Sequence, residues 1–250
     1  MDLVEHRGSL SERHPWEQSR ARAIVQILDN AGIRHVDSIL DYGCGDAYTG
    51  RFLLEWLQAR SLTGVDVNLS DEQCRAFAED ERRMTLTPRE SDLGEQRFGL
   101  ILLCDVIEHV EDDQTLLAVA RRRLAPGGHL VVTVPAFQKL FTDHDRMLKH
   151  FRRYSRSELE GSLTKAGLSV RGSGYLFGSL LPVRASGKAV ELVRGARTVT
   201  EGVGDWRGGA RLTKVLSGMF DADNSLLLAL SRRGLNLPGL SAWALCRSSE

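Results

Sequence analysis

The sequence has no uncharged apolar run long enough to cross a bilayer, and charged residues occupy several of its first seven positions. A membrane-spanning helix needs about 20 mostly apolar residues, and a secretory leader needs a shorter apolar segment behind its N-terminus. Neither pattern is present. We therefore expect a soluble, cytoplasmic protein.

Cysteine is scarce and dispersed. The four cysteines (Cys44, Cys74, Cys104 and Cys246) form no CxxC pair, which is the spacing typical of zinc sites and redox motifs. Well-separated cysteines favour free thiols over a disulfide framework. The sequence therefore predicts a reduced compartment and no cysteine-based metal site.

An excess of one charge sign is also missing, because 33 basic residues balance 33 acidic ones. Proteins that hold nucleic acid through its backbone need a positive surface field, which a neutral chain does not create globally. We expect no nucleic-acid partner. The length of 250 residues suits one larger α/β domain with a sizeable core.

What the sequence does have is an apolar run that meets a two-glycine turn between Ile39 and Gly50, with apolar residues at helical spacing beyond it. This order predicts a strand, a tight loop and the start of a helix. Glycine lets a backbone turn with positive φ or approach a ligand closely, and a helix N-terminus offers free N–H groups. A small ligand is expected to dock there.

Two absences narrow the choice of ligand. A dinucleotide fingerprint needs a third glycine three residues after Gly45, where this chain has Tyr48, and a P-loop needs a lysine that the stretch lacks. Acidic residues are present instead, since Asp41 precedes the turn and Asp66 ends the next apolar run. Carboxylates suit a ligand with an ammonium group and ribose hydroxyls, such as S-adenosylmethionine.

Strand and helix patterns alternate from Val36 onward, which predicts a mostly parallel sheet with helices on both faces. Further strands are expected over 62–67, 84–87, 98–104, 129–134 and 168–172, and helices start at Pro15, Arg51, Asp71, Asp113 and Ser157. The last of these helices is expected to begin with a capping box of Ser157 and Glu160, and a turn is expected at 126–128. Ligands of such sheets bind beyond the carboxyl ends of the strands. The positions expected at or near those ends are Asp41, Asp66, Asp92 and Cys104.

The segment 176–240 departs from this alternation. It carries helical patterns near 180–194 and 212–233, joined by a glycine-rich link over 202–209, before a closing strand over 241–247. A helical insertion at this place predicts a cap over the cleft, while a packing appendage or a dimer surface stays an open alternative. We divide the single domain, 1–250, into a cofactor-binding core (15–175), a helical cap or insertion (176–240) and a closing strand and tail (241–250).

Five short motifs follow one another along the core. They are Leu-Asp-Tyr-Gly-Cys-Gly at 40–45, Gly-Val-Asp at 64–66, Ser-Asp-Leu at 91–93, Cys-Asp-Val-Ile-Glu-His-Val at 104–110 and Leu-Ala-Pro-Gly-Gly at 124–128. In this order they resemble the class I S-adenosylmethionine-dependent methyltransferases, in particular the small-molecule branch with the ubiquinone-type O-methyltransferases. The resemblance implies a Rossmann-like, seven-stranded, mostly parallel sheet whose last strand is antiparallel.

The resemblance also implies which residues hold S-adenosyl-L-methionine, the methyl donor. The methionine moiety would lie on Gly43 and Gly45, with its ammonium facing Asp41, and the ribose hydroxyls would bind Asp66. Position 46, often Thr or Ser in the family, is Asp46 here. The other implied cofactor contacts, three of them around the adenine, are Val67, Asp92, Leu93 and Cys104. Arg20 and Arg22 of the first helix are expected to be solvated, and a contact of one of them with the carboxylate of the cofactor stays an open alternative.

A first candidate for the chemistry follows the fourth strand, where Asp105, Glu108 and His109 fall at helical spacing on one side of a turn. Ubiquinone-type relatives carry a similar Glu-x-x-Glu-His that holds a divalent metal. Three interpretations stay open: such a metal site, His109 as a substrate-facing base, or a hydrogen-bonded structural turn. The predicted site takes His109 as catalytic and includes no metal.

A second candidate is the basic run 144–156, which interleaves histidines and arginines with aromatic residues. It is either a solvated charged face or a place where arginines hold an anionic acceptor through bidentate contacts. In the second interpretation Arg152 and Arg153 bind a carboxylate or phosphate. His150 and Tyr154 then approach the acceptor as catalytic residues.

Taken together, the sequence predicts a methyltransferase that acts on a small-molecule acceptor. Oxygen is the expected target atom, on the resemblance alone, and the acceptor is expected to be anionic. Two alternatives stay open: methylation of a glycan or lipid-linked precursor at a membrane surface, where 176–240 contacts the membrane, and a non-catalytic protein that binds S-adenosylmethionine as a partner or sensor. A homodimer is compatible with the sequence.

Overall fold

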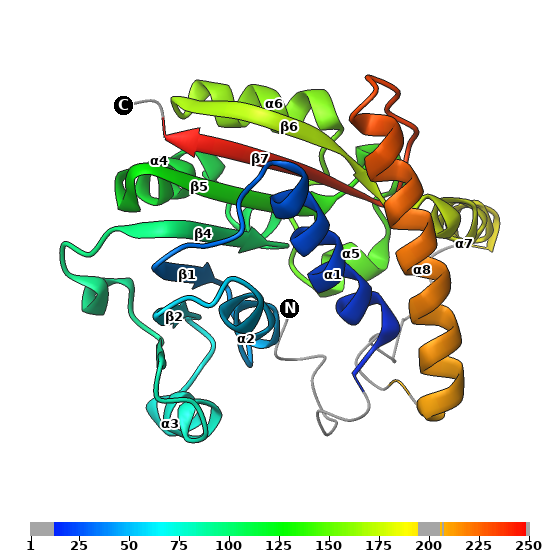
Figure 1. Cartoon of the computed structure of the whole chain (residues 1–250). Coiled ribbons are helices and arrows are strands. Elements are labelled where there is room, and N and C mark those ends of the chain that lie inside the picture. Colours follow the sequence, from blue (N-terminus) through cyan, green and yellow to red (C-terminus); the bar gives the residue numbers. More distant parts are fainter. Residues whose placement is uncertain (1–12, 195–205, 207, 249–250) are drawn as a thin grey trace.

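The fold is built on a seven-stranded sheet with the strand order β3-β2-β1-β4-β5-β7-β6 (Figure 1). The computed structural model describes residues 13–194, 206 and 208–248. β1 to β5 pair in parallel, whereas β7 runs antiparallel to both of its neighbours. The predicted fold class is confirmed. The strands are β1 (Ser38–Tyr42), β2 (Ser61–Val65), β3 (Met84–Thr87), β4 (Phe98–Cys104), β5 (Leu124–Pro135), β6 (Leu168–Leu176) and β7 (Ser241–Ser248).

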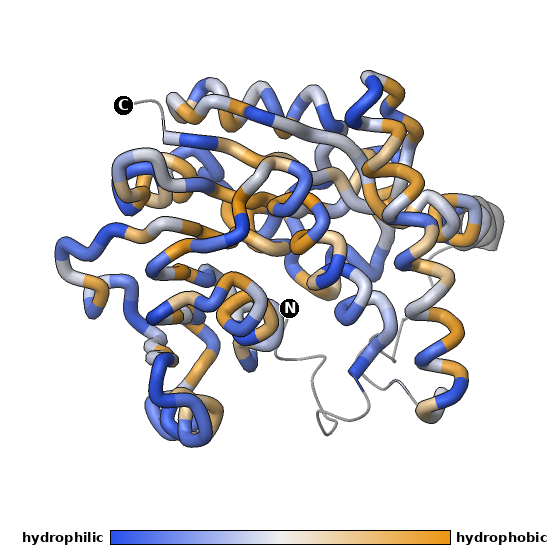
Figure 2. The backbone as a smooth tube through the Cα atoms, viewed as in Figure 1, coloured by the Kyte–Doolittle hydropathy of each residue, from blue (hydrophilic) through white to orange (hydrophobic). Residues whose placement is uncertain are grey.

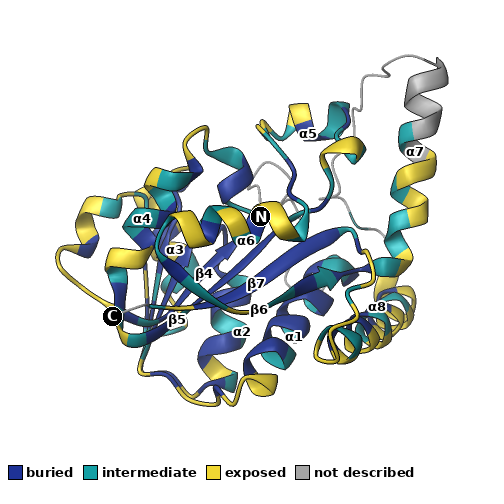
Figure 3. Ribbon diagram, turned by 90° about the horizontal axis from the view of Figure 1, so that it is seen from above, coloured by how far each residue is buried: buried dark blue, intermediate teal, exposed yellow. Residues whose placement is uncertain are grey.

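Helices cover both faces of the sheet (Figure 3). α1 (Pro15–Asn30), α2 (Tyr48–Trp56) and α8 (Gly209–Ser231) pack on one face, and α4 (Asp113–Arg123) and α6 (Arg156–Lys165) pack on the other. The remaining helical segments are α3 (Asp71–Ala78), α5 (Asp143–Met147), α7 (Leu181–Arg194) and the 3₁₀ turns η3 (Glu90–Leu93), η4 (Ile107–His109), η5 (Gln138–Leu140) and η6 (Gly178–Leu180).

β4 shows why the sheet has two cores. Leu100 and Leu102 join the apolar cluster under α1 and α2, whereas Ile101 and Leu103 join the cluster under α4 and α6. Side chains alternate between the faces of a strand, so a strand buried on both faces carries an uninterrupted apolar run. The predicted strand over 98–104 is confirmed in full.

Two local predictions were wrong. The capping box expected of Ser157 and Glu160 is formed two residues earlier, where the Ser155 hydroxyl accepts from the Glu158 N–H and the Glu158 carboxylate accepts from the Ser155 N–H. Both pairs have the same spacing, so the sequence alone does not distinguish them. The expected turn at 126–128 lies inside β5, beside a shift in the pairing of β5 with β4.

The insertion between β6 and β7 is helical, as predicted, and its longer helix packs beside α1. α8 lies along α1 and packs against β6 (Figure 1). Asp221 of α8 accepts hydrogen bonds from Ser19 (2.6 Å) and Arg22 (2.8 Å) of α1. α8 therefore extends the helical layer of α1.

α7 is the part of the insertion that approaches the loops after β5. Arg184 of α7 donates to the Asp145 carboxylate at 2.7 Å and to the Thr142 hydroxyl at 2.6 Å. A cap over the cleft stays a prediction that now concerns α7, since most of the glycine-rich link 202–209 lies outside the described residues. Within the described ranges, no helix is both long enough and apolar enough to span a membrane.

Candidate functional site

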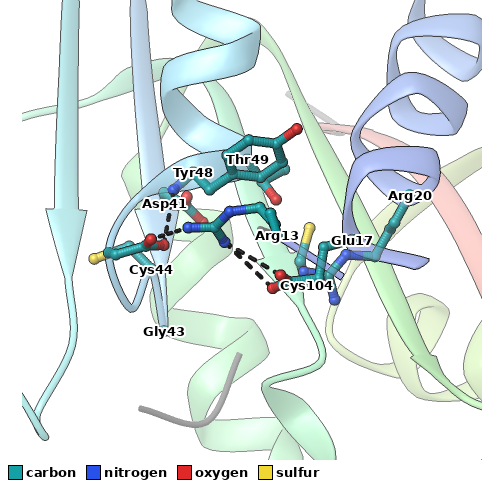
Figure 4. A pocket seen from close by; sticks show the side chains of 10 residues that line it. Arg13, Glu17, Arg20, Asp41, Gly43, Cys44, Tyr48, Thr49 and Cys104 are labelled. Atoms are coloured by element: carbon teal, nitrogen blue, oxygen red, sulfur yellow. Dashed lines mark hydrogen bonds and ion pairs between the residues drawn. The ribbon is translucent and has the colours of Figure 1, made fainter. Parts of the chain in front are cut away.

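The glycine turn after β1 meets α1 and the end of β4 at a small pocket (Figure 4). Its cavity is only about 10 Å³, which is room for about one water molecule. Three predicted cofactor residues, Asp41, Gly43 and Cys104, lie in its wall. The other lining residues are Arg13, Glu17, Arg20, Cys44, Asp46, Tyr48 and Thr49.

Gly43 is a glycine for two physical reasons. Its φ is +62°, in the left-handed region, and a Cβ there would lie 2.8 Å from Cγ2 of Val106. Gly45 has a similar φ of +55°. The turn therefore keeps its backbone close to Val106, just after the end of β4.

A side chain at Gly43 is expected to remove cofactor binding. We expect Gly43→Ala to reduce the affinity for S-adenosylhomocysteine by at least tenfold, because the turn must shift away from Val106; a tenfold loss is about 1.4 kcal/mol. Isothermal titration calorimetry measures this. Gly94→Ala is the control, since Gly94 also has a positive φ (+51°), but a Cβ there would have no atom within 4 Å. Equal affinity losses in both variants would contradict the role of the turn.

Asp66, which directly follows β2, is hydrogen-bonded to the glycine turn after β1. Its carboxylate accepts from the Gly45 N–H (2.9 Å) and from the backbone N–H of Asn68 (2.9 Å), and the side chain is buried. The structure thus brings Asp66 to the glycine turn. Its contact with ribose hydroxyls stays a prediction.

Asp41 is a buried carboxylate beside the same turn. It is 3% exposed, and burial raises its pKa from 3.8 to about 7, although Arg20 and the Gly50 N–H favour the ionised form. A buried carboxylate with so little compensation is unfavourable in the unliganded protein. Such a group is suited to a cationic ligand.

Arg13 fills the side of the pocket that the methionine moiety was expected to occupy. Its guanidinium donates to Asp46, lies 3.3 Å from the Glu17 carboxylate, and stacks 4.1 Å from the centre of the Tyr48 ring. Asp46, the departure from the family pattern, is thus the partner of Arg13. A ligand of the size of methionine fits only if Arg13 moves.

Arg20 was expected to be solvated, and this was wrong. It is buried, donates to the Asp105 carboxylate, and lies 4.5 Å from the centre of the Trp16 ring. Asp105 itself has a φ of +57°, a conformation that non-glycine residues rarely adopt outside functional sites. The ion pair fixes the end of β4 against α1.

A second cluster of polar side chains adjoins the pocket at the glycine turn through Asp105. It consists of Glu108, His109 and His150, each of which places one potential metal-ligand atom within 4.8 Å of the others. The centres of the two imidazole rings lie 4.5 Å apart, in an edge-to-face arrangement. Glu108 is fully buried, and neither carboxylate oxygen has a hydrogen-bond partner among the described residues. Burial, together with the nearby Asp105, raises the pKa of Glu108 well above its usual value.

The three residues expected on one side of the turn, Asp105, Glu108 and His109, therefore come together only in part. Glu108 and His109 come together, whereas Asp105 is paired with Arg20 and His150 takes the third place. Sequence reasoning selected His150 and His109 separately and had no signal that they touch, since they lie in different loops.

Asp145 orients His150. Its carboxylate lies 3.1 Å from Nδ1 of His150 and also accepts from Nε of Arg153 at 2.8 Å and from Arg184 at 2.7 Å. These hydrogen bonds hold the pKa of Asp145 well below its usual value although burial opposes the shift. An ionised carboxylate only accepts, so Nδ1 of His150 carries the proton and Nε2 is left as the acceptor.

Two predicted roles in the basic run need correction. Arg153 is buried and donates to Asp145 and to the Ala136 carbonyl, so it is not available to an acceptor. The Tyr154 hydroxyl donates to Asp113 at 2.8 Å, and its ring packs in the core under α4 and α6. Burial and this hydrogen bond raise the pKa of Tyr154 strongly. Both side chains are structural because successive residues of the run point in different directions.

Arg152, the other residue predicted to bind the acceptor, is partly exposed. It donates to the Glu111 carbonyl and lies 3.6 Å from the Asp113 carboxylate. This contact leaves part of the guanidinium accessible, so its role with an acceptor stays a prediction.

The residues expected near the adenine are dispersed. Val67 is 81% exposed, and Asp92 is exposed and accepts from the Thr87 hydroxyl and from Nε of Arg89. Asp92 and the buried Leu93 line a larger cavity of about 410 Å³ beside α3 and β3, which shares no residue with the pocket at the glycine turn. Their contacts with adenine stay predictions.

A family model described as the methyltransferase domain matches residues 15–172. Two curated relatives match the chain. A ubiquinone biosynthesis O-methyltransferase of Alkalilimnicola ehrlichii is 26% identical over 132 residues (50% of this chain, 51% of the relative). A trans-aconitate 2-methyltransferase of Pseudomonas aeruginosa is 29% identical over 145 residues (54% and 51%). The chain spans about half the length of the curated relatives it matches.

Among solved structures, the N-methyltransferase NodS of Bradyrhizobium japonicum WM9, in complex with S-adenosyl-L-homocysteine, has a similar fold, with a TM-score of 0.57 at 17% identity over 96% of this chain and 90% of NodS. This likeness concerns the fold. The family model covers more than half of the chain and includes the glycine turn, the Asp105 segment and the Asp145–His150 pair. The chain therefore belongs to the methyltransferase-domain family.

Proposed function

We propose that the chain transfers the methyl group of S-adenosylmethionine to a small-molecule acceptor. The observation that carries this proposal is Asp41, a carboxylate 3% exposed beside a two-glycine turn, in a small pocket that is also lined by the cations Arg13 and Arg20. The ammonium of the methionine moiety would occupy the space that the Arg13 guanidinium fills in the unliganded pocket. The matched family and the two methyltransferases among the relatives support the reaction.

The pocket at the glycine turn and the cluster of Glu108, His109 and His150 would have different roles in the reaction. Asp41 and Asp66, with the glycine turn, would bind and orient the donor, and positioning of this kind contributes up to roughly 7–11 kcal/mol in well-oriented reactions. Arg20 and Asp105 fix the segment that joins the donor pocket to the two histidines. The methyl–sulfur bond breaks as the bond from the acceptor atom to the methyl carbon forms.

We further propose that the acceptor atom is oxygen, with His150 as the proton acceptor. The Asp145 carboxylate leaves Nε2 of His150 free to accept a hydroxyl proton while the oxygen attacks the methyl group. The edge of His109 supports the ring of His150. The ubiquinone-biosynthesis relative supports O-methylation, and the trans-aconitate methyltransferase supports an anionic acceptor, for which the partly exposed Arg152 offers a cation.

The test combines binding with turnover. Calorimetry with S-adenosylmethionine and S-adenosylhomocysteine is followed by incubation with matched neutral and anionic acceptors that carry hydroxyl, amine or carboxylate groups, and mass spectrometry detects the added methyl group. Transfer to a hydroxyl or carboxylate supports the full proposal. Binding without turnover across the panel favours the non-catalytic alternative, and absence of binding overturns both.

Replacing His150 by Gln is expected to lower kcat for a hydroxyl acceptor by roughly 10²–10⁴-fold, the range typical of general base catalysis. Affinity for S-adenosylhomocysteine should stay unchanged, since His150 does not line the donor pocket. His35→Gln is the control, because its side chain is 60% exposed near the start of β1. An unchanged kcat in the His150 variant would remove the proposed base.

A second candidate function is methylation of a lipid-linked or glycan precursor at a membrane surface. The observation that favours it is an exposed apolar face on α8, at the edge of the molecule (Figures 1 and 3).

A further inference from the structure

α8 has two apolar faces. Phe220, Leu227 and Leu228 are buried on the face that packs inward. The opposite face carries a stripe of four large apolar side chains that are 47–58% exposed: Leu212, Val215, Met219 and Leu226. The hydropathy of this helix is visible along its length in Figure 2.

The stripe follows the helical period closely. The four large residues, with the exposed Ala222 and Ala229, are separated alternately by three and four positions, a spacing that keeps side chains on one side of an α-helix. At about 1.5 Å per residue the stripe is about 25 Å long. Single exposed apolar residues are common on surfaces, but a continuous stripe of this length marks a contact surface.

The charges of α8 are separated in the same way. Arg211 and Lys214 are exposed in the first turns, and Arg232 and Arg233 are exposed just after the last turn, where Arg232 also donates to Asn30 of α1 at 2.9 Å. Both acidic residues of the helix face the protein, because Asp221 accepts from Arg22 and Ser19, and Asp223 accepts from the Ser179 N–H and hydroxyl. The outward side of α8 is therefore apolar along its middle and basic at both ends.

The placement of basic residues at both ends of the apolar stripe favours an anionic membrane over a second copy of α8 as the partner. Two copies of α8 paired through the stripe would bring basic ends close to basic ends in the antiparallel arrangement and align identical basic residues in the parallel one, so both arrangements are repulsive. An anionic bilayer surface offers phosphate groups to the basic ends and an acyl boundary to the stripe. We propose that α8 docks the protein on an anionic membrane surface, with the stripe inserted at the boundary between headgroups and acyl chains.

The proposal stands apart from methyl transfer, since it depends on α8 and not on the donor pocket. Flotation on a density gradient measures it, with the full chain mixed with vesicles of phosphatidylcholine alone or of phosphatidylcholine with phosphatidylglycerol. We expect the protein to float with the mixed vesicles at least roughly tenfold more than with the neutral ones, since each basic residue near an anionic surface adds to binding.

The triple variant Leu212→Ser, Met219→Ser, Leu226→Ser should lose flotation, and Arg211→Glu with Lys214→Glu should lose the preference for anionic vesicles. Met147→Ser is the control, because Met147 is 42% exposed on a different helix. Thermal unfolding should be unchanged in all variants, since the substituted side chains are exposed.

Three results would overturn the proposal: no flotation with either vesicle, flotation that the serine substitutions leave unchanged, or a dimer in sedimentation analysis that those substitutions dissociate. The last would assign the stripe to a second copy of this chain. Loss of flotation in the serine variant with donor binding retained separates this surface from the proposed function.

Discussion

The Asp41→Asn variant is expected to be more stable than the wild-type protein above pH 7 and to bind S-adenosylhomocysteine much more weakly. Burial raises the pKa of Asp41 to about 7, against an ordinary value of 3.8. The folded state therefore opposes ionisation of this group, and the unfolded state does not. A residue placed for folding alone would show the reverse pattern.

The sign of the pH dependence follows from that raised pKa. Below about pH 4 the carboxyl is protonated in both states and costs nothing. As pH rises from 4 to 7 the unfolded chain ionises first, so stability is lost, and the full cost is present above pH 7. Asn carries no charge and avoids this cost, which is on the order of 4 kcal/mol for a shift of this size. The stability advantage of the variant should therefore grow between pH 4 and 7 and then level off.

Binding should respond in the opposite direction. The ammonium of the donor would compensate the buried charge of Asp41, and hydrogen bonds to charged groups contribute about 1.5–3 kcal/mol. The expected loss of affinity is therefore roughly 10- to 100-fold. Differential scanning calorimetry at pH 5 and pH 8, with titration calorimetry at pH 8, measures both effects. Asp37→Asn, at a side chain 69% exposed beside the same strand, is the control. A destabilised variant that retains affinity would make Asp41 a structural residue.

The sequence predicted the parts of this site that depend on local pattern. The glycine turn and the positions at the strand ends were found because a buried parallel strand, a turn residue and a helix start each have a signature within a few residues. The mostly parallel sheet followed from the alternating patterns, and its seven strands with an antiparallel last strand followed from the resemblance. Asp41, Gly43 and Cys104 line one pocket, whereas Asp92 lines another.

The ion pairs could not be predicted. Arg20 and Asp105 are 85 residues apart, and Arg13 and Asp46 are 33 apart. A charged residue has no periodicity that identifies its partner, so solvation was the reasonable expectation for Arg20. Burial of a guanidinium is favourable only with a carboxylate close by, which only the fold shows.

The prediction that the basic run 144–156 forms an acceptor site was wrong for Arg153 and Tyr154 for a different reason. His150, Arg153 and Tyr154 are neighbours in sequence, and a common cleft was inferred from that proximity. In the fold, the His150 ring contacts the His109 ring, and Arg153 donates to Asp145. The Tyr154 ring packs in the core under α4 and α6. An irregular segment has no fixed period, so adjacent residues need not share a face.

Asp145→Ala is expected to cost about 3–5 kcal/mol of unfolding free energy, the range for removal of one partner from a buried ion pair. The Asp145 side chain is fully buried and accepts hydrogen bonds from Arg153, Arg184 and His150. Its loss leaves the buried guanidinium of Arg153 without a carboxylate. Urea unfolding at pH 7 measures the change.

The pH dependence of this contribution has the usual sign for a carboxylate. Because the folded pKa lies below the unfolded one, the stabilisation is present above about pH 4 and is lost as pH falls further. The wild-type and Ala proteins should therefore converge in stability only under strong acid. Asp143→Asn is the matched control on the same helix: its partner Arg146 is 62% exposed, and a surface pair contributes about 0–1 kcal/mol.

Asp145 should also affect turnover, because it sets the tautomer of His150. Asp145→Asn keeps the side-chain volume, so it separates positioning from packing when kcat is measured at temperatures where the variant is folded. If Asp145 acts through His150, its substitution lowers kcat in the wild-type background and has little further effect in the His150→Gln background, since coupled residues are not additive. Equal losses in the two backgrounds would restrict Asp145 to holding Arg153 and Arg184. In that case the buried carboxylate would serve the fold alone, and His150 would need another group to orient it.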